Sequence, residues 1–337
     1  MPYNLPTSSL QHVMPFDAPV FVAGHRGMVG SALVRRLLTE GYTNLLTCNS
    51  AELDLRNQAA VQQYFADRQP AYVFLAAARV GGIIANSTRK GEFIYDNLMI
   101  QANVIHSAYT AGVKRLLFLG STCIYPKLSP QPIKEEYLLT GALEPTNDAY
   151  AIAKIAGIAM CRSYNEQYGT QFLAVMPNNL YGPNDNFDLT GSHVLPALIR
   201  KFHEAKKSGA ATVTVWGTGS PLREFMHVDD LADASLFLMN QPEGSYSSLL
   251  TSPLTPALIN VGSGQEISVA DLARMVKGIV GFKGEIVFDT SKPDGTMRKL
   301  ADSSRLHTLG WRHHIDFDEG VRAAYRWFVE NCEEPRP

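Results

Sequence analysis

The chain carries, over residues 19–30, the sequence Pro19-Val-Phe-Val-Ala-Gly-His-Arg-Gly-Met-Val-Gly30. An apolar run leads into a turn rich in glycine, and the apolar spacing after the turn is helical. Strand, glycine turn and helix in this order are typical of a dinucleotide-binding unit, because glycines allow a tight turn and a close approach of the backbone. The N–H groups that open the helix are then available to a pyrophosphate. The stretch therefore predicts a dinucleotide site near the start of the chain.

Further apolar runs follow at residues 44–47, 72–78, 115–120 and 171–176, and helical patterns separate them, the longest at 91–111. This alternation predicts an α/β fold, a Rossmann-type doubly wound parallel sheet. Right-handed crossovers place the carboxyl ends of the strands at one edge, where ligands bind. Residues near the ends of different strands are therefore expected to meet in one site.

The regular alternation of apolar runs and helical patterns ends after Pro183, which suggests that the chain is divided into two domains. We expect a disordered extension over 1–16 and an NADP-binding Rossmann domain over 17–185 plus about 227–262. A smaller C-terminal α/β substrate-binding domain is expected over 186–226 and 263–337, with strands at 212–216 and 285–288. Residues 241–257, rich in Ser, Pro and Thr, are expected to form an exposed loop insertion.

The composition excludes several classes of function. The 337 residues have a formal net charge of -2 and no basic stripe, so nucleic acid is not an expected partner. No apolar run is long enough to span a membrane, and no export signal is recognisable. The four cysteines are widely spaced, which favours reduced thiols in a cytoplasmic protein and argues against a structural metal site.

The residues after the second predicted strand bear on the choice of dinucleotide. Cys48-Asn49-Ser50 stands where an NAD-type domain places an acid for the ribose 2′-hydroxyl. The missing carboxylate and Arg26 in the glycine turn favour NADP(H). Asp54 and Leu55 suit the adenine end of the cofactor, although Asp54 is equally suited to capping a helix.

Tyr150-Ala-Ile-Ala-Lys154 is the candidate catalytic stretch, with Ser121 after the fourth strand. Residues four apart share one face of a helix, so the phenol and the ammonium can point into one site. A lysine cation beside a tyrosine favours the phenolate, which predicts a lowered pKa and a general acid or base. The alternative is a chance pairing, because a Tyr-x-x-x-Lys pair is common on helices.

Several longer motifs resemble those of GDP-L-fucose synthases, a group within the extended short-chain dehydrogenase/reductase family. They are Gly24–Gly30, Ala78-Arg-Val-Gly-Gly82, Leu119–Lys127, Glu144-Pro-Thr-Asn147, Tyr150–Gly157, Asn179–Pro183, Ser192-His-Val194, Arg223-Glu-Phe225 and Lys292–Thr296. The resemblance implies NADPH-dependent conversion of GDP-4-dehydro-6-deoxy-D-mannose to GDP-L-fucose, by epimerisation at C3 and C5 and then reduction of the C4 ketone. It also implies a homodimer through helices around 93–109 and 149–168.

The resemblance assigns roles to individual residues. Cys123 would be the epimerisation base and His193 its acid partner; Tyr150 would protonate the C4 oxygen, Lys154 would hold the nicotinamide ribose, and Ser121 would orient the carbonyl. Cofactor contacts are implied at Gly24, His25, Arg26, Gly27, Met28, Val29, Gly30, Ser50, Asp54, Leu55, Leu119, Ser121, Tyr150, Lys154, Pro177, Asn178, Asn179, Leu180 and His193. Substrate contacts are implied at Lys201, Trp216, Arg223 and Lys299, the alternatives being a solvated helix face for Lys201 and a core position for Trp216.

The chain departs from the family pattern at Thr122, Asn178, Asn49-Ser50 and the loop 187–192, which leaves the position of His193 open. Two rival functions are considered. Another nucleotide-sugar epimerase, reductase or dehydratase would keep Ser121, Tyr150 and Lys154 but would have no use for Cys123 and His193 as a pair. A non-catalytic NADP-sensing protein would not need an intact triad.

Overall fold

The computed structural model describes residue 3 and residues 12–189, 191–250, 257–292 and 294–332. Most of the extension predicted to be disordered, residues 1–16, lies outside this range. Within its described part the side chain of Met14 is fully buried, and the Met14 amide donates a hydrogen bond of 3.0 Å to Asn240 Oδ1.

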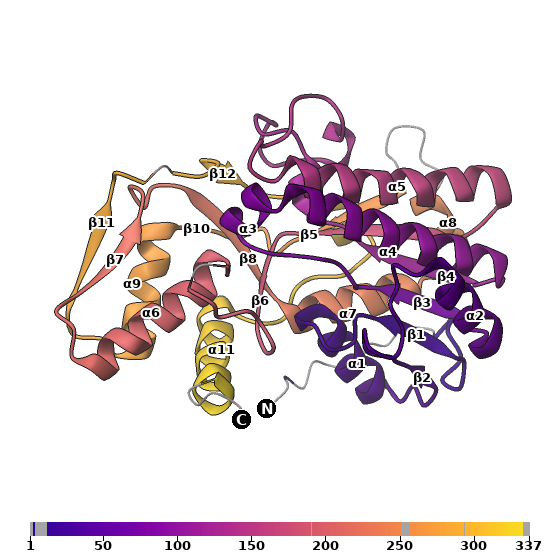
Figure 1. Ribbon diagram of the computed structural model, residues 1–337, viewed down its shortest axis with the longest axis horizontal. Helices are drawn as coiled ribbons and strands as arrows, with labels where there is room; N and C mark the ends of the chain where they lie inside the picture. Colours follow the sequence, from indigo (N-terminus) through magenta and orange to yellow (C-terminus); the bar gives the residue numbers. More distant parts are fainter. Residues whose placement is uncertain (1–2, 4–11, 190, 251–256, 293, 333–337) are drawn as a thin grey trace.

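A parallel sheet of six strands forms the centre of the larger part of the molecule (Figure 1). Its order is β2-β1-β3-β4-β5-β9, and every neighbouring pair is parallel. The strands are β1 (Val20–Ala23), β2 (Leu45–Leu46), β3 (Tyr72–Leu75), β4 (Arg115–Leu119), β5 (Phe172–Pro177) and β9 (Leu258–Val261). This order confirms the predicted doubly wound α/β fold, and the chain reverses direction across the sheet beside β1, where such folds bind ligands.

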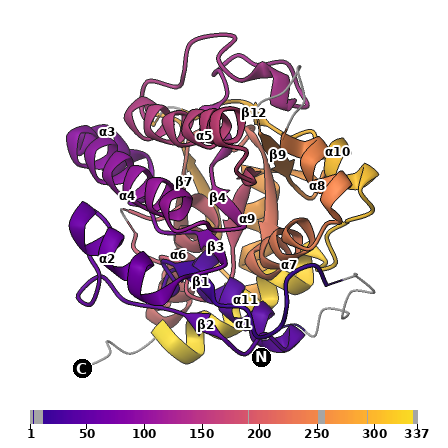
Figure 2. The ribbon, with the colours of Figure 1, turned by 90° about the vertical axis from the view of Figure 1, so that its right-hand side faces the viewer.

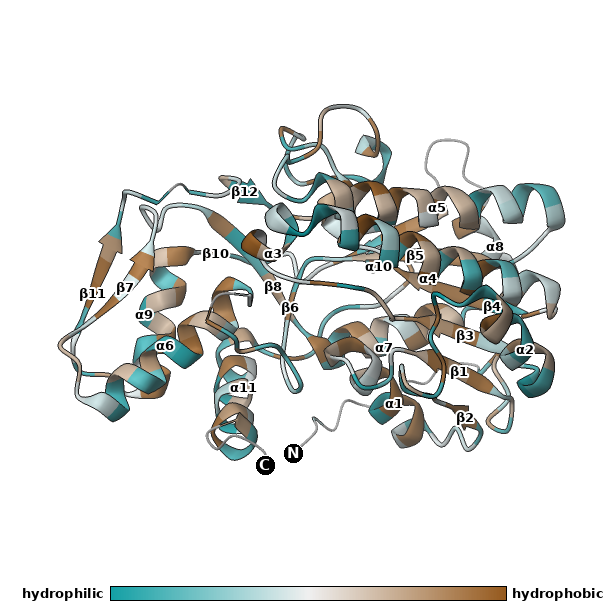
Figure 3. Ribbon diagram, viewed as in Figure 1, coloured by the Kyte–Doolittle hydropathy of each residue, from teal (hydrophilic) through white to brown (hydrophobic). Residues whose placement is uncertain are grey.

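Helices cover both faces of the sheet, which explains why its strands are apolar throughout rather than alternating (Figure 2). Residues of β1 alternate between two cores: Val20 and Val22 pack with α1 (Met28–Glu40) and α7 (Val228–Met239). Phe21 packs on the other side with α2 (Gln58–Arg68), α4 (Lys90–Thr110) and α5 (Asp148–Tyr168). Figure 3 shows the strands of this sheet mainly in brown, whereas the helices around it carry both brown and teal residues.

The second part of the molecule lies at the opposite end from α2 (Figure 1). There β8 (Leu222–His227) pairs with β6 (Asn179–Tyr181), β10 (Glu266–Ser268) and β12 (Arg298–Lys299), while β7 (Thr212–Trp216) pairs with β11 (Glu285–Asp289). A third core joins α6 (Val194–Ser208), α9 (Val269–Val280) and α11 (Phe317–Cys332). Because α7 and β9 return to the large sheet, we propose the domain division expected from the sequence.

The segment 241–257, expected to be an exposed loop, is described over 241–250 and at 257, and there the expectation is wrong. Residues 243–250 form the helix α8 (Glu243–Leu250), and its Tyr246 is fully buried. The guanidinium of Arg115 lies 4.1 Å from the Tyr246 ring centroid and donates to the carbonyl oxygens of Met239 (2.9 Å) and Gln241 (2.7 Å). The buried arginine from β4 thus anchors a segment whose composition resembles a loop.

Shorter helices complete the described chain: α3 (Ile83–Thr88), α10 (Ser304–Thr308) and the 3₁₀ turns η1 (Thr122–Ile124) and η2 (Glu135–Tyr137). No helix of the described residues combines the length and the apolar character that crossing a membrane requires.

Candidate active site

The glycine turn forms a cradle that fits a pyrophosphate. Gly24 has φ +86°, and a Cβ added there would lie 2.7 Å from the amide nitrogen of Ala77. A Cβ added at Gly30 would overlap with the carbonyl of Gly24. Gly27 occupies the N-cap of α1 and makes no side-chain cap bond, so no side chain satisfies the N–H groups of the first turn there. These features support the predicted contacts through residues 24–30.

The features predicted to favour NADP(H) are present beside this turn. Arg26 and Ser50 are exposed, and Arg26 has no side-chain partner among the described residues. Cys48 and Asn49 are half-buried, and no acid takes the expected ribose position at the end of β2. An unpaired guanidinium is suited to a 2′-phosphate.

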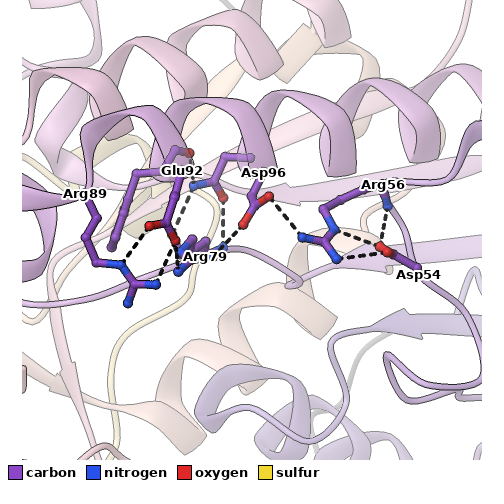
Figure 4. Close-up of polar contacts among 8 residues, drawn as sticks. Asp54, Arg56, Arg79, Arg89, Glu92 and Asp96 are labelled. Carbon is purple, nitrogen blue, oxygen red and sulfur yellow. Dashed lines mark hydrogen bonds and ion pairs between the residues drawn. The ribbon is translucent and has the colours of Figure 1, made fainter.

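Asp54 does not cap a helix, because Asn57 accepts the hydrogen bond from the Ala60 amide at the start of α2. The two carboxylate oxygens of Asp54 accept from Arg56 at 3.0 and 2.9 Å. Arg56 also donates to Asp96 at 3.2 Å, and Asp96 accepts from Arg79 at 2.7 Å (Figure 4). The capping alternative is therefore wrong, and the Asp54 loop is tied through charges to the loop after β3.

That loop, which follows Ala78, is held on both of its sides. Asn97 of α4 accepts from the Arg79 amide and donates to the Arg79 carbonyl, both at 3.0 Å. The Gly82 amide donates to the Gly191 carbonyl at 2.8 Å, and a Cβ at Gly82 would lie 2.8 Å from the Ser192 carbonyl oxygen. The segment before His193, whose position the sequence left open, thus lies against the Gly81-Gly82 turn.

Ser121, Tyr150 and Lys154 meet at the carboxyl end of β4. Ser121 follows the strand, and its hydroxyl accepts from the Cys123 amide at 3.3 Å and is hydrogen-bonded to the Tyr150 phenol. Lys154, one turn further along α5, is buried and donates from Nζ to the Leu119 carbonyl at 2.7 Å. The topology brings together the three residues that the sequence grouped by motif.

The ionisation of this group differs from the prediction. Burial raises the pKa of Tyr150, and the hydrogen bond from Ser121 only partly opposes this effect. Burial also lowers the pKa of Lys154 to about 7. Both side chains lie where α5 packs on the sheet, so loss of water disfavours the phenolate and the ammonium alike. Without cofactor, the tyrosine is held as a proton donor and is not activated as a phenolate.

Cys123 has nitrogen donors on two sides. Asn147 Nδ2 donates to its sulfur at 3.3 Å, and Lys299 Nζ from β12 lies 3.7 Å from the same atom. His193 is the N-cap of α6, and its pKa is lowered first by desolvation and then by the positive charge of Lys299. Lys299 therefore contacts the Cys123 sulfur, and its positive charge also acts on His193.

The segment after β5 contains four of the predicted cofactor contacts, residues 177–180. Pro177 ends the strand, Asn178 is buried, and Leu180 belongs to β6 and packs into the core beneath α1 and α7. Asn179 Nδ2 donates to the Glu224 carbonyl at 2.8 Å, which ties this segment to β8.

The residues assigned to substrate form two neighbouring pairs. Trp216 is 53% exposed at the end of β7, so the core alternative is wrong, and Lys201 Nζ lies 5.3 Å from its ring centroid. Arg223 of β8 and Lys299 of β12 are register partners in paired strands. Asp294 interacts with residues near both pairs. Its carboxylate accepts from the amide of Thr218, two residues after Trp216, at 2.9 Å, and its negative charge acts on Arg223.

Sequence reasoning left two residues of this region without a role. Asn147 lies in the quoted Glu144–Asn147 motif, and Lys292, whose Nζ is 5.9 Å from the Trp216 ring centroid, lies in the quoted Lys292–Thr296 motif. Their motif membership was the available signal. Within the described ranges no cluster of His, Cys, Asp and Glu could hold a metal ion.

Comparison with known proteins agrees with this geometry. The model of the NAD dependent epimerase/dehydratase family matches residues 20–251. A putative GDP-L-fucose synthase 2 of Arabidopsis thaliana is 58% identical over 320 residues, which cover 95% of this chain and 94% of that protein. The crystal structure of a GDP-L-fucose synthetase from Naegleria fowleri bound to NADP is similar at a TM-score of 0.85 and 30% identity, covering 98% of this chain and 99% of that one.

A crystal structure of a GDP-6-OMe-4-keto-L-xylo-heptose reductase from C. jejuni is similar at a TM-score of 0.89 and 42% identity, covering 94% and 99% of the two chains. The match to the family model, and the identity to a relative along almost the whole chain, show that this protein belongs to the NAD dependent epimerase/dehydratase family and, within it, to the GDP-L-fucose synthases.

Proposed function

We propose that this protein is an NADPH-dependent enzyme that converts GDP-4-dehydro-6-deoxy-D-mannose to GDP-L-fucose by 3,5-epimerisation followed by 4-keto reduction. One observation carries the proposal: the reductase group of Ser121, Tyr150 and Lys154 shares its site with a second group, in which Lys299 stands beside Cys123 and acts on His193. A simple reductase would need only the first group.

Epimerisation uses the acidity of the protons at C3 and C5, which lie α to the C4 ketone. Cys123 removes such a proton as a thiolate, and the electrons of the C–H bond pass to the C4 oxygen as an enolate. Ser121 and Tyr150 stabilise that oxygen by hydrogen bonds. His193 returns a proton to the carbon from the other face.

Reduction follows at C4, for which bound NADPH supplies the hydride. Tyr150 gives its phenolic proton to the C4 oxygen, and its raised pKa keeps that proton available at neutral pH. Ser121, bonded to the phenol, orients the carbonyl. Lys154, which is buried and donates to the Leu119 carbonyl, would hold the nicotinamide ribose.

The nucleotide half of the substrate has a matching surface. Trp216 offers an exposed aromatic face for the base or the ribose, with Lys201 and Lys292 at its ring. Arg223 and Lys299 are suited to the diphosphate, and Lys299 reaches the reacting end of the site through Cys123.

A homodimer is part of the proposal, with α4 and α5 as the interface. These helices lie side by side on the outside of the sheet (Figures 1 and 2), and Tyr95, Ile152 and Tyr168 on them are 60%, 47% and 45% exposed. Antiparallel packing of two such pairs would bury these apolar groups in a four-helix interface. Analytical ultracentrifugation of the wild type and of the double variant Tyr95→Glu/Ile152→Glu tests the proposed dimer. We expect a dimeric wild type and a monomeric variant, and a monomeric wild type would contradict the proposal. A cytosolic location stays a prediction from the sequence.

The test of function is NADPH oxidation with GDP-4-dehydro-6-deoxy-D-mannose in deuterated water, followed by measurement of deuterium in the product. Deuterium at both C3 and C5 with stoichiometric NADPH consumption is the expected result. Reduction without exchange would leave a 4-reductase, the activity named for the C. jejuni relative, and would remove Cys123 and His193 from the mechanism.

A further inference from the structure

Asn147 occupies the N-cap of α5 but does not cap it. Asparagine at this position usually accepts a hydrogen bond from the second or third helical N–H and so stabilises the helix. Here the side chain makes no cap bond. Its amide nitrogen instead donates to the sulfur of Cys123 at 3.3 Å. The helix that carries Tyr150 and Lys154 therefore begins without its ordinary side-chain cap.

The backbone at Asn147 is held by the turn before the helix, so the direction of its side chain is well defined. The Asn147 amide donates to the Glu144 carbonyl at 3.1 Å, and Glu144 accepts from the Thr146 amide and hydroxyl. A salt bridge of 2.9 Å between Lys127 and Glu144 fixes the turn from outside. The quoted motif Glu144-Pro-Thr-Asn147 thus forms a hydrogen-bonded turn that carries the Asn147 side chain.

The sulfur of Cys123 lies between two unlike donors. Asn147 is neutral and comes from the Rossmann side, whereas Lys299 is basic, 3.7 Å away, and comes from β12. Two other titratable groups interact with this pair. Tyr150 interacts electrostatically with Cys123, and its raised pKa keeps it neutral. The pKa of His193 is lowered in part by the charge of Lys299. Both donors can form a hydrogen bond to this sulfur, and such a bond is stronger to a charged acceptor than to a neutral one.

The second atom of the same amide is unsatisfied. Asn147 Oδ1 is buried and has no hydrogen-bond partner within the described part of the chain. A buried acceptor without a partner destabilises the folded protein, so a site that retains one is suited to a ligand that supplies the donor. A hydroxyl of the hexose ring, bound next to the carbon from which Cys123 removes a proton, is such a donor.

We propose that Asn147 is a positioning residue for the epimerisation half of the reaction: its Nδ2 holds the sulfur of the base Cys123 in place, and its Oδ1 accepts a hydrogen bond from a sugar hydroxyl. The inference rests on the proposed function. It assigns Asn147 no part in the hydride step, whose residues Ser121, Tyr150 and Lys154 do not bond to the Asn147 side chain.

The test uses Asn147→Asp and Asn147→Ser. Both residues are good N-caps, so the helix start is preserved. Aspartate keeps the oxygen for the sugar but replaces the N–H donor by a carboxylate that opposes the thiolate, and serine is too short to serve either partner. Asn57→Asp is the matched control, because Asn57 is the N-cap of α2 and its side chain does cap that helix.

Three quantities are measured on the full chain: deuterium incorporation at C3 and C5, oxidation of GDP-L-fucose by NADP⁺ as a readout of the hydride step alone, and the pH profile of iodoacetamide labelling at Cys123. For Asn147→Asp we expect exchange to slow by about 10- to 100-fold. Labelling of Cys123 moves to higher pH, while oxidation of GDP-L-fucose and the substrate KM are unchanged. Asn147→Ser slows exchange and also raises the KM. Asn57→Asp matches wild type in all three.

Each contrary result is distinct. Equal loss of exchange and of GDP-L-fucose oxidation would assign Asn147 a merely structural role in α5, and exchange at the wild-type rate in Asn147→Asp would likewise overturn the proposal, as would an unmoved labelling profile. Absence of exchange in wild type itself would refute the proposed function instead. Thermal unfolding of both variants near the wild-type temperature shows that these readouts do not reflect misfolding.

Discussion

Replacement of Lys154 by methionine is expected to stabilise the cofactor-free protein while abolishing reduction. Lys154 is 2% exposed, and burial lowers its pKa to about 7 from 10.5. Between these two values the folded lysine is mostly neutral while the unfolded lysine is protonated. The unfolded state therefore binds more protons, and the free energy of unfolding rises with pH in this window. Methionine is similar in length and cannot ionise, so it removes this dependence.

The magnitude follows from the two pKa values. One pH unit corresponds to about 1.4 kcal/mol, so at pH 7.5 wild type loses about 4 kcal/mol by keeping Lys154 buried. The variant leaves the Leu119 carbonyl without its 2.7 Å donor, which costs about 1–2 kcal/mol. We expect Lys154→Met to be more stable by about 2–3 kcal/mol at pH 7.5 and to equal wild type near pH 9.5.

Urea denaturation followed by tryptophan fluorescence at pH 7.5, 8.5 and 9.5, without cofactor, measures this difference. Lys114→Met is the matched control, because Lys114 is exposed and its loss leaves the pH dependence unchanged. NADPH oxidation is followed in parallel and is lost only in Lys154→Met. A stability difference that is constant over the three pH values, or a variant less stable than wild type throughout, would refute the reasoning.

Further outcomes are expected at other sites. Gly30→Ala should weaken NADPH binding by about 10- to 100-fold in a fluorescence titration, because its Cβ overlaps with the Gly24 carbonyl; Gly91→Ala, with nothing within 4 Å, should not. Cys123→Ser should reduce deuterium exchange at C3 and C5 by about 100-fold and leave GDP-L-fucose oxidation by NADP⁺ intact; equal loss of both would remove its assignment as base. Trp216→Ala should raise the KM for the GDP-sugar by about 3- to 10-fold at unchanged kcat in steady-state kinetics, with Trp216→Phe close to wild type; a changed kcat alone would contradict a binding role. Arg115→Met should lower the free energy of unfolding by about 3–5 kcal/mol in urea, because buried carbonyls lose their donor; an unchanged midpoint would show that α8 does not depend on it.

Much of the fold was accessible from local pattern. The strands of the large sheet are short apolar runs, and the predicted runs at 72–78, 115–120 and 171–176 contain or overlap β3, β4 and β5. A parallel sheet covered on both faces requires such runs, so pattern and structure share one cause. The helix α8 shows the limit of this reasoning. Its composition is typical of a loop, and it is helical where Arg115, distant in sequence, and Tyr246 pack together.

The site was accessible only in part. Ser121, Tyr150 and Lys154 could be grouped because each is placed by an element next to the same strand end. The sign of the pKa shift at Tyr150 could not be predicted, because the sequence shows the neighbouring lysine but not the loss of water around both groups. Likewise the sequence suggested a capping role for Asp54, whereas the carboxylate is bound by Arg56 and Asn57 caps α2.

By itself the sequence predicted the doubly wound class of fold, the glycine turn and the Tyr150–Lys154 pair, since each is visible as a local pattern of residues along the chain. Only the tertiary structure decided what surrounds Cys123. Asn147 reaches its sulfur from 24 positions away and Lys299 from 176 positions away. The physical reason is that local periodicity encodes which face of an element is buried, whereas the partners and the dielectric of a site are set by the packing of elements that are distant along the chain.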